Sequence, residues 1–256
     1  MRRVSKPWPP ADVSPDGQIQ RSFADAEREY LDALRDHQER TAFARSEFDR
    51  LDKGKLRAVM YREQRSICIF CEREIKEEYP APRIDHWKPL SINHELALHW
   101  KNLYLSCTTA GTCDDAKGDN SLRCDEDDPD LPWPTELHYE NLVGFTSRGE
   151  IYVRMDTNVG DDVRRAVALA MDKQPRGAGY RPAILNLNHP ALVEARAAAI
   201  DAEKSRMSKE FAGRTASKPE REQRAATLLG ENPFPAFVSV RVAYLRKSFG
   251  AGRDER

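Results

Sequence analysis

The order of hydrophobic and polar positions along the chain predicts several helices joined by irregular stretches. Between residues 22 and 49, apolar side chains recur at helical spacings among many charges, which predicts one long amphipathic helix. A second helix is expected over residues 53–64. Residues 190–211 begin with proline in the first turn and continue with alanine, leucine and isoleucine, a composition typical of a helix.

Strand patterns are shorter and lie in the middle of the chain. The runs SICIFC and RIDHW predict short strands, whereas most of residues 68–130 has an irregular pattern. The run ENLVGFTSRGEIYVRMD predicts a β-hairpin, because two β-rich stretches flank a turn in which Gly149 can take a positive φ. From residue 161 the pattern is helical again. Residues 212–223 are expected to be a loop, and residues 236–249 a helix or a strand.

These elements predict an α+β protein that is predominantly helical. We divide it into an extended, proline-rich arm (1–20), an N-terminal helical region (21–66), a core with short strands and the hairpin (67–158) and a C-terminal helical region (159–256). No apolar run reaches the ~18 residues of a spanning helix, and the basic N-terminus lacks the apolar stretch of a secretion signal. The expected location is therefore the cytoplasm, away from membranes.

Charge is distributed unevenly, although the whole chain has a formal net charge of only −1. Residues 68–130 hold 14 acidic and 7 basic side chains, and they also contain all five cysteines. Acidic residues beside cysteines and histidines favour the binding of cations over the direct binding of phosphates. A nucleic acid would need bound metals, or basic residues from the flanking regions, to approach this segment.

The spacing of the cysteines predicts a metal site. Cys68 and Cys71 form a CxxC pair, and Cys107 and Cys113 form a second pair, with 35 residues between the two pairs. Two thiolate pairs that converge on one point suit tetrahedral zinc, and a metal site is favoured over disulfides in a cytoplasmic protein. The five residues between Cys107 and Cys113 exceed the usual spacing, but a loop containing Gly111 can bring both sulfurs together. Cys124 is expected to be a core or surface thiol.

Three runs in this segment resemble the HNH endonuclease motif: IDHWKPL at 84–90, WKNLYLSC at 100–107 and CDDAKGD at 113–119. They contain, in order, an Asp-His pair followed by proline, an Asn-Leu before a cysteine, and a helix start after a cysteine with a Lys-Gly. The resemblance covers about residues 65–120. It implies a ββα-metal core stabilised by a four-cysteine zinc site, and an enzyme that hydrolyses nucleic-acid phosphodiesters.

The resemblance also implies roles for individual residues. His86 would be the general base, since a neutral imidazole can take a proton from water near neutral pH. Asp85 and Asp114 would hold a catalytic Mg²⁺ or Mn²⁺, and the amide of Asn102 would brace the loop that carries the base.

The position of Asp114 is usually His or Asn in that family, so Asp115 or Asp119 could take its place as a ligand. Lys88 and Lys117 are candidate contacts to the phosphate.

The outer segments RRVSKPWPP and AILNLNHPALVEAR extend the resemblance to the HNH subunit of Septu-type anti-phage defence systems, including those attached to retrons. This resemblance implies a nuclease that works beside an ATPase of the ABC/SMC-like class. DNA is the expected substrate, and RNA stays open. The alternative is a zinc-stabilised, non-catalytic subunit that binds nucleic acid or the ATPase.

Overall fold

The structure, a computed structural model, describes residues 1–7, 9–78, 80–122, 131–154, 157–171, 174–176, 179–181 and 184–247. Within this part of the chain the fold is α+β, with more helix than strand. None of the helices described is both long enough and apolar enough to cross a membrane.

The helices and strands follow the chain from end to end. The helices are α1 (Phe23–Leu34), α2 (Arg40–Asp49), α3 (Lys53–Gln64), α4 (Cys113–Lys117), α5 (Tyr139–Leu142), α6 (Asp161–Met171), α7 (Pro190–Glu210), α8 (Lys218–Gly230) and α9 (Val238–Leu245). The strands pair in antiparallel order as β1 (Arg83–His86) with β2 (Leu103–Ser106), β3 (Val143–Phe145) with β4 (Ile151–Val153), and β5 (Gln174–Arg176) with β6 (Gly179–Arg181).

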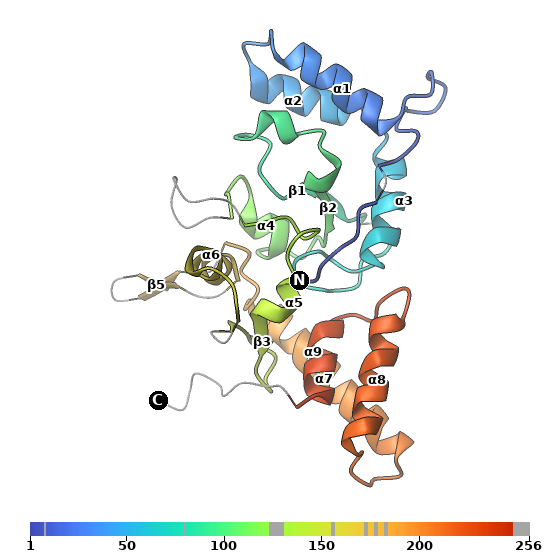
Figure 1. The fold of residues 1–256 in the computed structure, drawn as a ribbon, viewed down its shortest axis with the longest axis vertical. Helices are drawn as coiled ribbons and strands as arrows, with labels where there is room; N and C mark the ends of the chain where they lie inside the picture. The colour runs from blue at the N-terminus through green and yellow to red at the C-terminus, as the bar shows by residue number, and fades with distance from the viewer. Residues whose placement is uncertain are drawn as a thin grey trace.

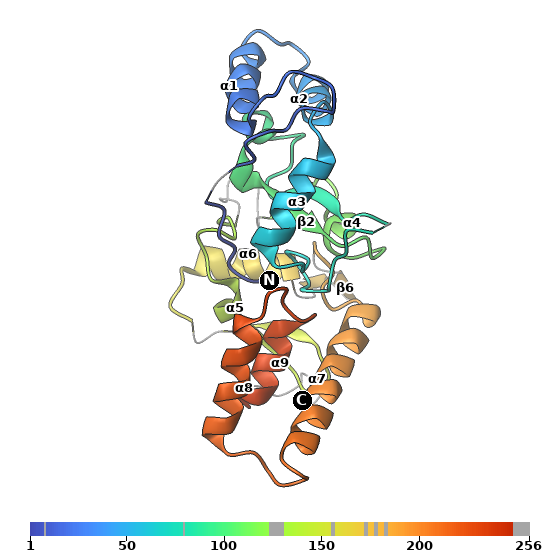
Figure 2. The same ribbon diagram turned by 90° about the vertical axis from the view of Figure 1, so that its right-hand side faces the viewer.

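The elements are arranged along one long axis. Helices α1 and α2 lie at one end, strands β1 and β2 with α3 and α4 lie in the middle, and α7, α8 and α9 form the other end (Figures 1 and 2). The N-terminal residues start near the middle and run beside α3 towards α1. Along this path the Lys6 ammonium pairs with Glu63 of α3 at 3.1 Å and lies over the Trp100 ring.

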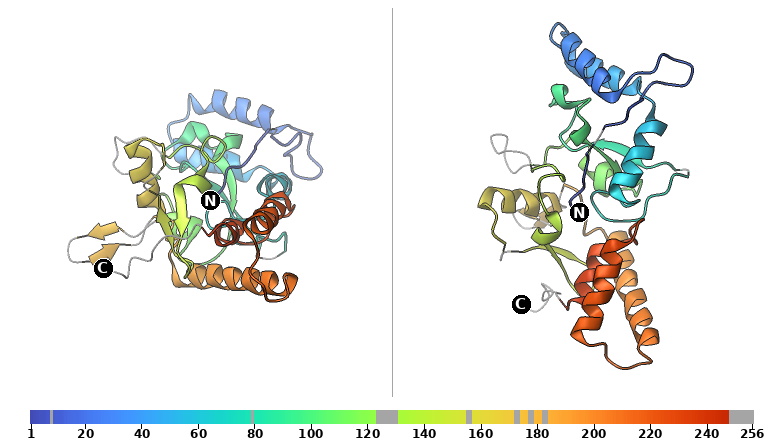
Figure 3. Two further views of the ribbon diagram at one scale, coloured as in Figure 1. Left: turned by 60° about the horizontal axis from the view of Figure 1, so that its bottom comes forward. Right: turned by 45° about the vertical axis from the view of Figure 1, so that its right-hand side comes forward.

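A buried ion-pair network joins the three C-terminal helices, which lie next to one another in Figure 3. Glu203 of α7 is buried and accepts hydrogen bonds from Arg224 of α8 at 2.8 Å and from Arg241 of α9 at 3.3 Å. A buried carboxylate is tolerated when it is paired and hydrogen-bonded in this way.

The prediction of one long helix over residues 22–49 is wrong. The chain forms α1 and α2 instead, separated by residues 35–39, and this break lets Phe43 fold back. Its ring stacks on Tyr30 with the centroids 5.7 Å apart and on His37 with the centroids 3.7 Å apart. The seven polar residues from Arg35 to Thr41 interrupt the apolar pattern and were the available signal.

Other helix predictions stand closer to the structure. Helix α3 has the predicted bounds and is capped by Asp52, whose carboxylate accepts from the N–H groups of Gly54 and Lys55. Helices α6, α7 and α9 are confirmed, and α9 is not a strand. The predicted loop at 212–223 is wrong from residue 218 onwards, because Ser217 and Glu220 form a capping box that starts α8.

The strands correct the sequence prediction in two places. RIDH forms β1 as expected, but SICIFC is a tight turn with one isolated bridge between Ile67 and Glu74. Strand β2 was not predicted, because all of its residues are buried and an alternating pattern is therefore missing. The β3–β4 hairpin is confirmed. Gly149 has φ +90°, and a Cβ there would lie 2.5 Å from the Val193 carbonyl oxygen.

Gln64 at the end of α3 ties that helix to β2. Its buried amide donates to the carbonyls of Ile67 at 3.0 Å and Leu105 at 2.9 Å, and its Oε1 accepts from the Leu105 N–H at 2.7 Å. These bonds hold the turn that follows α3 against the strand. They therefore place the first cysteine pair beside the second.

We expect Gln64→Leu to lower the free energy of unfolding by about 2–4 kcal/mol, because the buried Leu105 N–H loses its acceptor. Urea denaturation measures the change. The exposed Gln38, between α1 and α2, offers the matched control, and Gln38→Leu should change the free energy by less than about 0.5 kcal/mol. Equal unfolding midpoints for the two variants would contradict the assigned role of Gln64.

Candidate functional site

Four cysteines from three segments of the chain meet in the middle of the molecule. Cys68 and Cys71 lie in the turn after α3, Cys107 follows β2, and Cys113 is the first residue of α4. The turn is closed by two backbone hydrogen bonds, from the Cys68 N–H to the Arg73 carbonyl at 2.8 Å and from the Glu72 N–H to the Cys68 carbonyl at 3.1 Å. All four side chains are buried.

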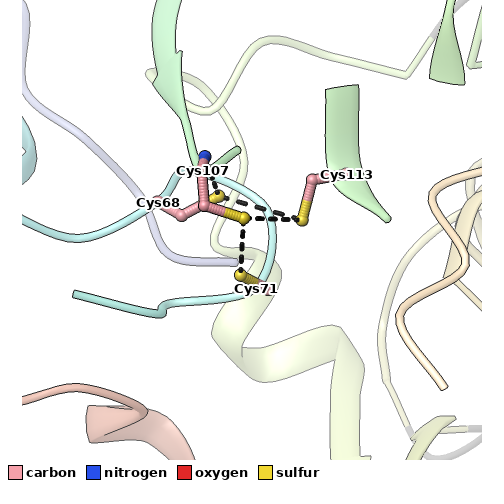
Figure 4. A group of neighbouring side chains, drawn as sticks. All are labelled: Cys68, Cys71, Cys107 and Cys113. Carbon is pink, nitrogen blue, oxygen red and sulfur yellow. Dashed lines mark hydrogen bonds between the residues drawn. The ribbon is translucent and has the colours of Figure 1, made fainter. Parts of the chain in front are cut away.

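The distances between the sulfurs fit a tetrahedral metal ion. The Sγ of Cys107 lies 3.7 Å from those of Cys71 and Cys113, and the Sγ of Cys68 lies 3.9 Å from that of Cys113 (Figure 4). A tetrahedral zinc ion with Zn–S bonds of about 2.3 Å separates its sulfurs by about 3.8 Å. All four lie within 4.8 Å of one another, so together they could hold a metal such as zinc.

The surroundings of the sulfurs favour thiolates that share a cation. The Cys107 N–H points to the Cys68 Sγ at 3.3 Å, and the Arg73 N–H points to the Cys71 Sγ at 3.5 Å. The neighbouring thiols raise the pKa of Cys71 and of Cys113, because several negative charges cannot share this buried space by themselves. A divalent cation would remove that penalty. Cys124 lies outside the described residues.

The cysteines also fix where α4 sits relative to β1 and β2. Since Cys107 directly follows β2 and Cys113 begins α4, a shared ion would hold the start of the helix against the strand. Strand β1 lies alongside β2, with Asp85 opposite Tyr104 in the register. Residues of α4 and β1 therefore face a common cavity of about 360 Å³.

Asp85 lines this cavity and is buried together with Lys117. The Lys117 ammonium, also buried, donates to both carboxylate oxygens at 2.9 and 3.1 Å and to the His86 carbonyl at 2.6 Å. Burial raises the pKa of Asp85 to about 7; the charge of Lys117 lowers it and that of Asp114 raises it further. Asp85 and Asp114 are thus close enough to interact electrostatically.

His86 also lines the cavity, and its protonation state is set by its surroundings. Its Nε2 lies 2.9 Å from the Ala97 carbonyl oxygen, which can only accept, so Nε2 carries the proton and Nδ1 is free to accept one. Burial lowers the pKa of the ring to about 4, so His86 is neutral at neutral pH. The ring also meets Phe48 of α2 edge-on, with 4.8 Å between the centroids.

Asn102 is completely buried and binds the segment that follows His86. Its Oδ1 accepts from the Lys88 N–H at 2.7 Å, and its Nδ2 donates to the carbonyls of Lys88 and Leu96, each at 3.0 Å. Its own carbonyl accepts from the Trp87 N–H at 2.8 Å. Asn102 therefore joins Lys88, which follows His86, to Leu96, which precedes Ala97, the partner of the His86 ring.

Asp114, Asp115 and Asp119, the three alternative positions for the second metal ligand, all line the cavity. Asp115 pairs with Arg83 at 2.9 Å and accepts from the Gly111 N–H at 2.8 Å, so Arg83 already neutralises its charge. Asp114 lies further from Arg83, at 3.6 Å, and interacts with Asp85. Among the described residues, the four cysteines are the one group of three or more potential ligands close enough to share an ion.

Neither of the two lysines predicted to contact phosphate offers a free ammonium group to the cavity. Lys117 lines it, but its ammonium is buried against Asp85 and is not available to an incoming anion. Lys88 lies outside the cavity lining, with its ammonium 5.5 Å from the centre of the Trp133 ring. Three residues of α2 also line the cavity, Arg45, Phe48 and Asp49, and no local motif in the sequence marks any of them.

No protein-family model matches this chain, and no curated protein matches it.

We expect Cys68→Ser to abolish stoichiometric zinc binding and to leave the protein poorly soluble, because the cluster joins three separate segments of the core. Metal analysis of the purified protein measures the effect, with one zinc per wild-type chain as the expected value. Cys124→Ser is the matched control, since the sequence predicts that Cys124 is not a ligand. Full zinc occupancy in Cys68→Ser would show that the cluster does not bind the ion.

Proposed function

We propose that this protein is a metal-dependent, HNH-type endonuclease that hydrolyses phosphodiester bonds of nucleic acid, with DNA as the favoured substrate. The observation that carries the proposal is the meeting of a neutral histidine, whose Nδ1 can accept a proton, with the carboxylates of Asp85 and Asp114 in one cavity. Further support comes from the resemblance in the sequence and from the placement of Asp85 and His86 on β1 and Asp114 on α4, beside four gathered cysteines.

His86 acts as the general base in this proposal. Its Nδ1 takes one proton from a water molecule, and the resulting hydroxide forms a bond to phosphorus. The bond between phosphorus and the 3′ oxygen breaks, and that oxygen leaves with a proton from solvent as a 3′ hydroxyl. The Ala97 carbonyl holds the ring in the tautomer that this step needs, and Asn102 holds the segment that joins the two residues.

Asp85 and Asp114 are the residues that would hold Mg²⁺ or Mn²⁺. Carboxylate oxygens are hard donors that suit these ions, and a cation would offset the burial, and the nearby charge of Asp114, that raise the pKa of Asp85. When bound, the ion would supply positive charge to the phosphate and to the departing oxygen. In the structure the ammonium of Lys117 partly neutralises Asp85.

The charge of the cavity limits how the isolated chain binds its substrate. Five aspartates line it, against three cationic side chains. A polyanion is therefore repelled until cations are bound, and we expect weak cleavage that falls steeply with salt when the chain works alone.

The proposal includes a role in anti-phage defence with an ABC/SMC-like ATPase as partner. Its support is the resemblance of the outer sequence segments to Septu-type subunits. Helices α7, α8 and α9 lie at the opposite end of the molecule from α1 and α2 (Figure 1), so a partner bound at that end would leave the cavity accessible. Co-purification of the chain with the product of an adjacent ATPase gene tests this part.

We expect His86→Ala to fold and to bind zinc normally but to lose at least about 10²-fold in plasmid cleavage, because the proton acceptor is gone. Cleavage of supercoiled plasmid with Mg²⁺ or Mn²⁺ measures the rate. His138→Ala, at an exposed histidine outside the cavity, is the matched control and should cut at the wild-type rate.

The same assay separates the nuclease from the non-catalytic alternative. A nuclease is inhibited by EDTA and is active again after Mn²⁺ is added, whereas a binding subunit retains plasmid without cutting it. Wild-type cleavage by purified His86→Ala would disprove the assignment of the base.

Asn102→Ala should slow cleavage by about 10-fold or more while zinc content stays at the wild-type level, because the segment carrying His86 loses three side-chain hydrogen bonds. Rates and metal content are measured on the same preparation. A parallel loss of zinc would show instead that Asn102 acts through the cysteine cluster.

A further inference from the structure

The cavity contains one cation that no other group neutralises. Of the described residues, three cationic side chains line it: Arg45, Arg83 and Lys117. Lys117 is bound to both oxygens of Asp85. Arg83 pairs with Asp115 at 2.9 Å and lies 3.6 Å from Asp114.

Arg45 differs from the other two in exposure and in partners. Its side chain is exposed, and within the described part of the chain its guanidinium takes part in no hydrogen bond or ion pair. It belongs to α2, in the N-terminal helical region, far in sequence from the residues assigned to the reaction. Three positions later on the same helix, and so on a neighbouring part of its surface, Phe48 contacts the ring of His86.

Helix α2 is held firmly beside this segment. The Thr41 hydroxyl lies 2.8 Å from the Nε2 of His94 and 3.5 Å from the Ser91 carbonyl, at one end of the helix. At the other end, Phe48 packs against His86. Contacts at both ends fix one wall of the cavity, and with it the point from which Arg45 projects.

We propose that Arg45 binds the non-bridging oxygens of the scissile phosphate, so that the N-terminal helical region completes the active site. This inference rests on the proposed nuclease function. Five aspartates line the cavity, so an anion there needs a cationic side chain that is not already paired with a carboxylate. The guanidinium offers a planar pair of N–H donors that matches two phosphate oxygens, and the negative charge on these oxygens grows as water attacks phosphorus.

The test compares the wild type with Arg45→Ala, Arg45→Lys and Arg40→Ala, all as full chains with Mn²⁺. Arg40 is the matched control: it is exposed on the same helix and does not line the cavity. Two probes are used, a supercoiled plasmid and bis(4-nitrophenyl) phosphate. The small diester reports on contacts to the reacting phosphate alone, without those made along a nucleic acid.

We expect Arg45→Ala to lower kcat/KM about 10²-fold on both probes, with most of the loss in kcat. Arg45→Lys should recover part of it, because the charge returns without the two-pronged geometry. Arg40→Ala should match the wild type on both probes.

The other outcomes overturn the inference in distinguishable ways. If Arg45→Ala slows plasmid cleavage only, Arg45 contacts nucleic acid away from the reacting phosphate. If Arg45→Ala matches the wild type on both probes, Arg45 has no part in the reaction, while the nuclease function stands. If the wild type shows no Mn²⁺-dependent cleavage of either probe, the nuclease proposal fails and this inference fails with it.

Discussion

The convergence of four sulfurs determines most of what this structure can do. Cysteine pairs separated by 35 residues are brought within 4.8 Å of one another, and the three segments that carry them come from the end of α3, the end of β2 and the start of α4. The strands of the central pair have only four residues each, too few to stabilise a sheet by themselves. A shared ion would supply the cross-link that such a small core needs, and the hydrogen bonds of Gln64 support the same junction from the side of α3.

The electrostatics of the neighbouring cavity follow from burial. Water is excluded from Asp85 and largely from His86, so the carboxyl group is harder to ionise and the imidazole harder to protonate than in solvent. The two shifts have opposite directions but the same cause. They leave a neutral proton acceptor next to an acidic group that a nearby cation would stabilise, and the proposed hydrolysis uses both.

The sequence allowed the cysteine cluster to be predicted because few residue types bind soft metals and because their spacing is distinctive. Helices α3 and α7 were predictable from capping and composition. The polar run at 35–41 marks the break between α1 and α2, but the packing of Phe43 on Tyr30 that goes with it is a tertiary contact. The capping box of α8 lies within a polar run that is typical of a loop. At the cavity, the motif pointed to Asp85, His86 and Asn102. The pairing of Lys117 with Asp85 and the position of Arg45 in the cavity lining depend on how distant segments pack, which local sequence patterns do not encode.

The position of Cys113 at the first residue of α4 has a consequence for redox chemistry. The short helix that begins there carries both Asp114 and Lys117, the two residues that interact with Asp85. Oxidation of the thiolates would expel a bound ion and release the start of α4, and Asp114 would then move away from Asp85. In the proposed nuclease, oxidation of the cysteine cluster would therefore disturb the acidic residues of the cavity together with the metal site.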